Sequence, residues 1–103
     1  MNKMSYDKAP KLPVRWDARL LQNQDKFQLL QIAVGTGDVI EKHDNPDDVT
    51  FYVLEGKGVL VVKGVVYEAI AGDTFFIPTG YQREWRNTGN QFLKLLVFKL
   101  LKG

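Results

Sequence analysis

The sequence contains no cysteine and a single histidine, His43, among its 103 residues. Without cysteine the chain can form no disulfide, no thiolate metal site and no thiol nucleophile. No apolar run approaches the roughly 18 residues of a membrane helix, and the first residues lack the apolar core of a signal peptide. Fourteen basic against 12 acidic side chains leave a net charge of +2, too small to indicate a polyanionic partner. We therefore expect a cytoplasmic protein that binds neither nucleic acid nor membrane.

The composition is that of one folded domain, with 45% hydrophobic and 25% charged residues. Residues 1–13 hold two prolines and several lysines without periodicity. They are interpreted as an N-terminal arm that is either flexible or laid across a neighbouring subunit. Residues 14–103 are expected to form the folded domain.

Short apolar segments separated by turn residues make up the rest of the chain. They are rich in Val, Phe, Tyr, Ile and Thr, and turn residues such as Gly, Asp and Asn follow most of them. Segments of this kind are expected at 27–34, 50–54, 59–62, 65–70, 74–77, 83–87 and 92–101. Regular spacing of short strands favours an all-β sandwich or barrel over alternating strands and helices.

Two of these segments, 59–62 and 95–98, are apolar at successive positions and therefore on both faces of a strand. An uncovered strand of this kind is an aggregation hazard, so something should cover its outer face. The simplest cover is a second copy of the chain, and we expect a homodimer.

The glycines, proline and asparagine of residues 37–87 have a spacing similar to that of a known family. Cupins combine the motif G-x5-H-x-H-x3/4-E-x6-G with the motif G-x5-P-x-G-x2-H-x3-N. The first is matched by Gly37, His43, Asn45, Val49 and Gly56, and the second by Gly72, Pro78, Gly80, Arg83 and Asn87. The chain thus resembles a small single-domain cupin of type 2 with a degenerate metal-binding motif. The resemblance implies an antiparallel double-stranded β-helix, which is a jelly-roll barrel and usually dimeric.

In metal-binding cupins the two motifs supply three histidines and a carboxylate to one divalent ion. The resemblance puts His43, Asn45, Val49 and Arg83 at these positions. Valine has no donor atom and arginine repels a cation, so His43 is the only retained ligand and no metal or other cofactor is expected. A divalent metal stays open as an alternative if Glu41 is recruited, because Glu41 shares the face of His43 on a regular strand.

The candidate site residues each have a structural and a functional interpretation. His43 is a wall residue, a ligand-binding residue or, if there is catalysis, its acid or base. Alternation directs Arg83 and Trp85 into the barrel, where Arg83 would pair with Glu41 or with an anionic ligand. Asn45, at the position of the second histidine in the first motif, is a further candidate ligand-binding residue. Three apolar residues, Phe51, Val53 and Trp85, are walls of a pocket or ordinary core.

Two other groups of charged residues are assigned surface roles. Asp47 and Asp48 are turn residues at the rim, and Lys94, Lys99 and Lys102 are solubilising or edge-protecting charges.

Three functions are compatible with this sequence. The leading hypothesis is metal-independent binding of a small organic molecule that carries a carboxylate or another oxyanion. The second is a cupin enzyme, either a metal-independent isomerase or epimerase or a dioxygenase-like enzyme with recruited metal ligands. The third is a dimeric structural or interaction module whose barrel interior is only core. The sequence leaves open whether the protein is an enzyme and which molecule it binds.

Overall fold

A computed structural model describes residues 1–43 and 45–102, in which nine strands and one short helix are found. The helix is a 3-10 turn, η1 (Tyr6–Lys8). The strands are β1 (Asp17–Asn23), β2 (Phe27–Val34), β3 (Val39–His43), β4 (Asp48–Glu55), β5 (Lys57–Val62), β6 (Val65–Ile70), β7 (Thr74–Ile77), β8 (Arg83–Asn87) and β9 (Leu93–Leu100). Within the described residues, no helix is long and apolar enough to cross a membrane.

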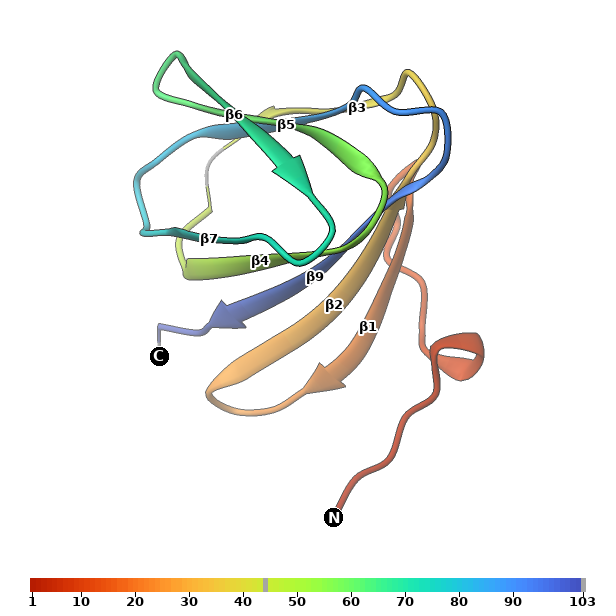
Figure 1. Cartoon of the computed structure of the whole chain (residues 1–103). Coiled ribbons are helices and arrows are strands. Elements are labelled where there is room, and N and C mark those ends of the chain that lie inside the picture. The colour runs from red at the N-terminus through yellow and green to blue at the C-terminus, as the bar shows by residue number, and fades with distance from the viewer. Residues whose placement is uncertain (44, 103) are drawn as a thin grey trace.

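The strands form two sheets that face each other (Figure 1). The larger sheet has the order β1-β2-β9-β4-β7, and the smaller one has the order β3-β8-β5-β6. Every strand pairing is antiparallel. The expectation of an all-β jelly-roll barrel is confirmed.

The segments of β1 and β3 are not among the apolar segments expected as strands, although a strand was considered at Glu41 and His43. Their segments, DARLLQN and VIEKH, carry charged residues at several positions and show no clean alternation. They form because the apolar inner faces of neighbouring strands need a cover, so tertiary contact overrides a weak local preference.

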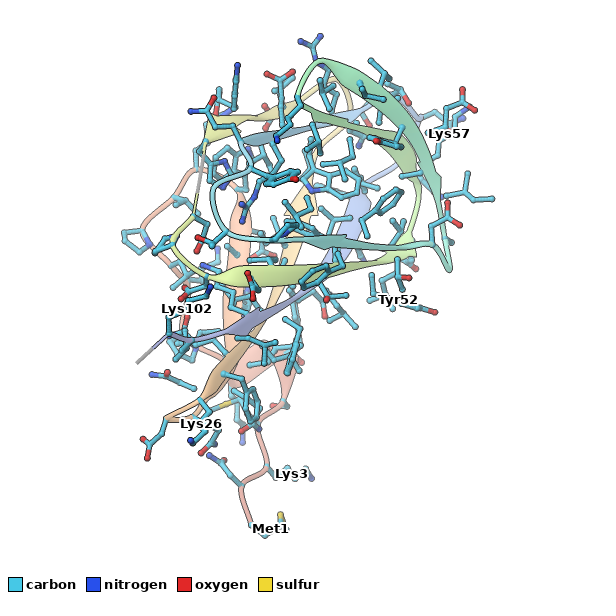
Figure 2. All side chains as sticks on the ribbon, turned by 90° about the vertical axis from the view of Figure 1, so that its left-hand side faces the viewer. Met1, Lys3, Lys26, Tyr52, Lys57 and Lys102 are labelled. Atoms are coloured by element: carbon cyan, nitrogen blue, oxygen red, sulfur yellow. The ribbon has the colours of Figure 1, made fainter. Side chains whose placement is uncertain are left out.

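The core lies between the sheets and follows the two-residue period of the strands (Figure 2). On β9, Leu93, Leu95 and Val97 are buried, whereas Phe98 is exposed. Across the interior, the rings of Phe51 and Trp85 meet edge to face with centroids 5.3 Å apart. This arrangement suits the charge distribution of aromatic rings.

Two turns show why glycine is required where it stands. Lys63 and Gly64 both have positive φ and join β5 to β6 in the two-residue hairpin form that matches strand twist. At Gly56, φ is +83°, and an added Cβ would lie 2.4 Å from the carbonyl oxygen of Phe92. Any side chain at Gly56 would therefore push β9 away.

The N-terminal arm packs on the barrel of its own chain in this structure. Ala9 is buried, and the backbone N–H of Leu12 donates to the carbonyl of Ala18 over 2.9 Å. The Tyr6 hydroxyl donates to the Asp17 carboxylate, which also accepts from Arg19 over 2.8 Å. Only the first few residues project from the barrel (Figure 1).

Candidate functional site

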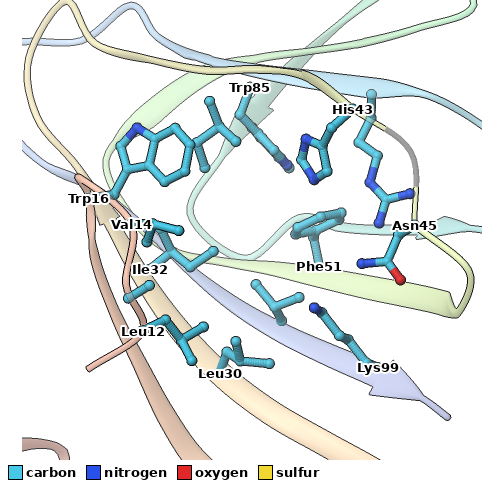
Figure 3. Close-up of a pocket in the computed structure, with 14 residues that line it drawn as sticks. Leu12, Val14, Trp16, Leu30, Ile32, His43, Asn45, Phe51, Trp85 and Lys99 are labelled. Atoms are coloured by element: carbon cyan, nitrogen blue, oxygen red, sulfur yellow. The ribbon is translucent and has the colours of Figure 1, made fainter. Parts of the chain in front are cut away.

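A cavity of about 160 Å³ opens between the two sheets beside the N-terminal arm. Its walls come from the arm and from strands of both sheets (Figure 3). The lining residues are Leu12, Val14, Trp16, Ala18, Leu30, Ile32, Ile40, His43, Asn45, Phe51, Arg83, Trp85, Val97 and Lys99. An apolar cavity of similar volume, about 150 Å³, is large enough for benzene.

The two ends of this cavity differ in chemistry. Figure 3 shows Leu12, Val14, Leu30 and Ile32 gathered at one end, with Trp16 beyond them. The opposite end carries the polar lining residues His43, Asn45 and Lys99 (Figure 3), and Arg83, which also lines the cavity, pairs with His43 across β3 and β8. Phe51 and Trp85 lie between the two ends (Figure 3). The cavity thus has a polar, cationic end and an apolar end.

Arg83 supplies a charge from the interior of the smaller sheet. The Arg83 side chain is 1% exposed, because every second residue of β8, namely Arg83, Trp85 and Asn87, points inward. The sequence predicts this orientation for Arg83 and Trp85. Its Nη1 donates to the carbonyl of Tyr81 over 3.2 Å, and its guanidinium carbon lies 5.9 Å from the centre of the Phe51 ring. Arg83 is therefore a fixed interior cation.

Lys99 supplies a second charge from the larger sheet, and the expectation of a surface role for it is wrong. It is half-buried and lines the cavity, into which its amine end is directed (Figure 3). Burial is the main cause that lowers the pKa of the Lys99 amine, and the nearby Arg83 charge lowers it further. The Asp47 carboxylate acts in the opposite direction and raises it. The sequence contained a signal for this position, since Lys99 continues the inward series Leu93, Leu95 and Val97.

His43 reaches the same end of the cavity through an irregularity in β3. Ile40 pairs with Trp85 and His43 pairs with Arg83, so three steps on β3 correspond to two on β8. With the extra residue of this bulge, Ile40 and His43 both line the cavity, although Ile40 is buried and His43 is exposed. The ring Nδ1 of His43 lies 2.9 Å from the carbonyl oxygen of Glu41 and therefore donates to it, which leaves Nε2 as the acceptor of the neutral ring.

Glu41 does not share the face of His43, because the same bulge breaks the alternation on which that expectation depended. Its carboxylate oxygens accept from Arg15 over 2.7 and 3.2 Å, and Arg15 also donates to Asp38. The Glu41 side chain is 64% exposed and is not part of the cavity wall. The pairing of Glu41 with Arg83 is thus replaced by pairing with Arg15.

Asn45 and Trp85 add hydrogen-bonding groups. The Asn45 side-chain oxygen accepts from the backbone N–H of Asp47 over 3.0 Å, and its amide nitrogen is directed toward the cavity (Figure 3). The Trp85 indole N–H is buried and meets no acceptor in the described part of the chain. It points toward His43 (Figure 3). A buried donor of this kind gains from any acceptor that a ligand or water brings.

Tyr52, Tyr67 and Tyr81 do not line the cavity that His43 lines. Tyr67 and Tyr81 line a separate hollow together with Phe75 and Phe76, and Tyr52 is exposed on β4. Proton transfer from His43 to one of these hydroxyls is therefore not supported by the fold.

The donor set does not fit a transition metal. Val49 is fully buried in the core, Arg83 brings a positive charge next to His43, and Asn45 offers only a weak ligand. Within residues 1–43 and 45–102, no three His, Asp or Glu side chains come together as a possible metal site. No chemistry is assigned to a metal ion here.

Comparison with known proteins decides the family. The cupin domain model matches residues 29–99, which is more than half of the chain. The chain belongs to the cupin family. An uncharacterized protein of Methanocaldococcus jannaschii is 32% identical over 65 residues, which cover 63% of the chain and 51% of that protein. An uncharacterized protein of Aquifex aeolicus is 36% identical over 67 residues, 65% of the chain and 54% of that protein. The matched part therefore spans about half the length of these relatives.

Solved structures share the fold of this cupin at low sequence identity. A predicted oxalate decarboxylase of Thermotoga maritima is 19% identical with a TM-score of 0.86, over 96% of this cupin and 98% of that chain. The polyketide cyclase RemF of Streptomyces resistomycificus is 24% identical with a TM-score of 0.86, over 99% and 80%. KdgF of Halomonas sp. is 14% identical with a TM-score of 0.85, over 99% and 96%. At these identities the likeness concerns the fold alone.

Proposed function

We propose that this cupin binds a small organic carboxylate with an apolar tail, held by protein cations instead of a metal ion. The observation that carries the proposal is the position of Arg83 and Lys99 at one end of a cavity whose other end is apolar. The carboxylate would lie at the cationic end, and the tail would extend toward Leu12, Leu30 and Ile32.

The charge distribution supports an anionic guest. A guanidinium that is 1% exposed and a half-buried amine place positive charge at this end, and the Asp47 carboxylate opposes it. Charge-assisted hydrogen bonds to Arg are the strongest polar contacts available to a carboxylate. Asn45 and His43 add groups that can donate to or accept from the same guest.

The volume of the cavity limits the size of the ligand. A volume of about 160 Å³ suits a tail of a few carbon atoms or one small ring. The walls around Phe51 and Trp85 are aromatic and apolar, so affinity for the tail would come from removing its surface from water.

Titration with 4-methylpentanoate tests the proposal. Trp16 and Trp85 both line the cavity, so their fluorescence reports binding. We expect saturable binding of the carboxylate and much weaker binding of its neutral amide. Arg83→Ala should weaken the carboxylate by about 1.5–3 kcal/mol, roughly tenfold or more. The matched control is Arg86→Ala, because Arg86 lies on the same strand with its side chain exposed. Equal binding of acid and amide, or no binding to the wild type, would contradict the proposal.

Metal-independent acid–base catalysis is the second candidate function. It is favoured by the contact of His43 Nδ1 with the Glu41 carbonyl, which fixes the ring with Nε2 as a base. The test is hydrogen–deuterium exchange at the carbon next to the carbonyl of 4-methyl-2-oxopentanoate. An exchange rate above that in buffer, which falls to the buffer rate in His43→Gln, would support catalysis. An exchange rate equal to that in buffer would contradict catalysis and leave ligand binding as the proposed function.

A homodimer is proposed as the state in which the protein acts. β6 and β7, which each form one of the two ends of their sheet, carry exposed apolar side chains, among them Val66 at 61%, Ile70 at 59% and Phe76 at 61%. A second copy would cover these edges and remove the unpaired strand groups from solvent.

A further inference from the structure

Lys99 is a primary amine held inside the barrel on a rigid strand. It pairs with Val49 on β4 and with Gln28 on β2, so strands of the larger sheet flank it on both sides. Lys94, on the same strand, has the opposite orientation and pairs with Glu55 over 3.0 Å. Two lysines of one strand thus have different environments, one inside the cavity and one at the surface.

The surroundings of Lys99 make the neutral form of its amine easier to reach than that of an exposed lysine. Burial in a largely apolar cavity is the main cause that lowers the pKa of the amine; the Asp47 carboxylate raises it, and the Arg83 charge lowers it by less than Asp47 raises it. Only a neutral amine has the lone pair needed for attack on a carbonyl carbon. Desolvation next to another cation is a known means of activating a lysine as a nucleophile.

We propose that Lys99 forms a reversible imine with the carbonyl group of an oxo acid whose carboxylate lies against Arg83. This inference rests on the proposed function, because the carboxylate must first be held at the cationic end. It narrows the ligand class from carboxylates in general to those with an aldehyde or ketone near the carboxylate.

The reaction is balanced without an oxidant or reductant. The Nζ lone pair attacks the carbonyl carbon, and the π electrons of the C=O bond move to oxygen. The oxygen gains a proton and the nitrogen loses one, which gives a carbinolamine. The nitrogen lone pair then expels the hydroxyl group, which leaves as water after protonation, and a C=N bond forms. The His43 imidazole lines the same end of the cavity and can carry these protons.

Reductive trapping tests the proposal on the full chain. The protein is incubated with 4-methyl-2-oxopentanoate and sodium cyanoborohydride, which reduces the imine to a stable secondary amine. We expect a single adduct with the mass of the oxo acid less one oxygen atom, mapped by peptide mass spectrometry to Lys99. Lys99→Arg keeps the positive charge but removes the nucleophile, and the adduct should be lost. Lys94→Arg is the matched control and should be labelled like the wild type.

A second ligand separates this inference from the proposed function. The acid 4-methylpentanoate has the same tail and carboxylate but no ketone. If it binds while trapping gives no adduct, or gives adducts spread evenly over the lysines, the imine proposal is wrong and carboxylate binding stands. If neither acid binds, both proposals fail. Peptide mapping of the wild type decides the matter even if Lys99→Arg does not fold.

Discussion

Arg83 lies directly opposite His43 in the pairing of β3 with β8. The resemblance to metal-binding cupins places ligands at both positions, yet here a permanent cation faces the one retained imidazole. A guanidinium next to the position where a metal ion would bind repels that ion and attracts an anion. This cupin is therefore expected to prefer a negatively charged ligand, whereas a metal-binding cupin binds a cation at the same place.

Metal content is the first consequence. Purified protein, dialysed extensively and without an affinity tag, should contain far less than one Fe, Mn, Ni or Zn per chain by elemental analysis. Only His43 among the four motif positions is a good ligand, and Val49 is closed off in the core. A metal content near one per chain after dialysis would show that other residues are recruited.

Lys99 should lower the stability of the fold at neutral pH. Its pKa is lower in the folded state than in the unfolded state, so the folded state holds fewer protons. The resulting destabilisation is fully present below the folded pKa and is relieved as the pH rises through it toward the unfolded value. Lys99→Met should raise the unfolding free energy by about 1 kcal/mol at neutral pH, with a smaller gain at alkaline pH. Urea unfolding across pH measures this, and a loss of stability would contradict it.

Glu41 should matter little for ligand binding. Its ion pair with Arg15 is exposed, with 49% and 64% of the two side chains accessible, so Glu41→Gln should cost less than about 1 kcal/mol of stability. Its affinity for 4-methylpentanoate should stay within twofold of the wild type, as judged by fluorescence titration. A loss as large as that of Arg83→Ala would mean that Glu41 reaches the cavity in solution.

The arm should loosen in acid through Asp17. The hydrogen bond from Tyr6 is the main cause that lowers the Asp17 pKa, and the bond from Arg19 adds to it. The stability that Asp17 contributes is therefore present above its unfolded pKa and is lost as the pH falls through the folded one. Asp17→Asn should be less stable than the wild type by about 1 kcal/mol or less at neutral pH, and the difference should vanish in strong acid. A difference independent of pH would point to packing instead.

The dimer is tested by sedimentation at micromolar concentration, where the wild type should have twice the mass of the chain. Val66→Glu places a charge on the exposed edge strand β6 and should give a folded monomer. The control is Lys26→Glu, at an exposed position in the turn between β1 and β2. A wild-type monomer would leave the exposed side chains of β6 and β7 without this explanation.

The parts that sequence predicted well are those governed by strand alternation. Arg83 and Trp85 were expected to point inward together, and both are buried. Glu41 could not be placed correctly, because a β-bulge adds one residue that no sequence period marks. Lys99 was missed because lysine is usually a surface residue, although its place after three inward residues on β9 indicated otherwise. The arm lacked any period, and its packing depends on tertiary contacts.

The most direct test of the account is an experimental structure of the protein crystallised with 4-methylpentanoate. Anion binding at the cationic end predicts electron density for the carboxylate within hydrogen-bonding distance of Arg83, with the branched tail among Leu12, Leu30 and Ile32. A metal ion at His43, or a cavity without the acid at saturating concentration, would contradict the central claim.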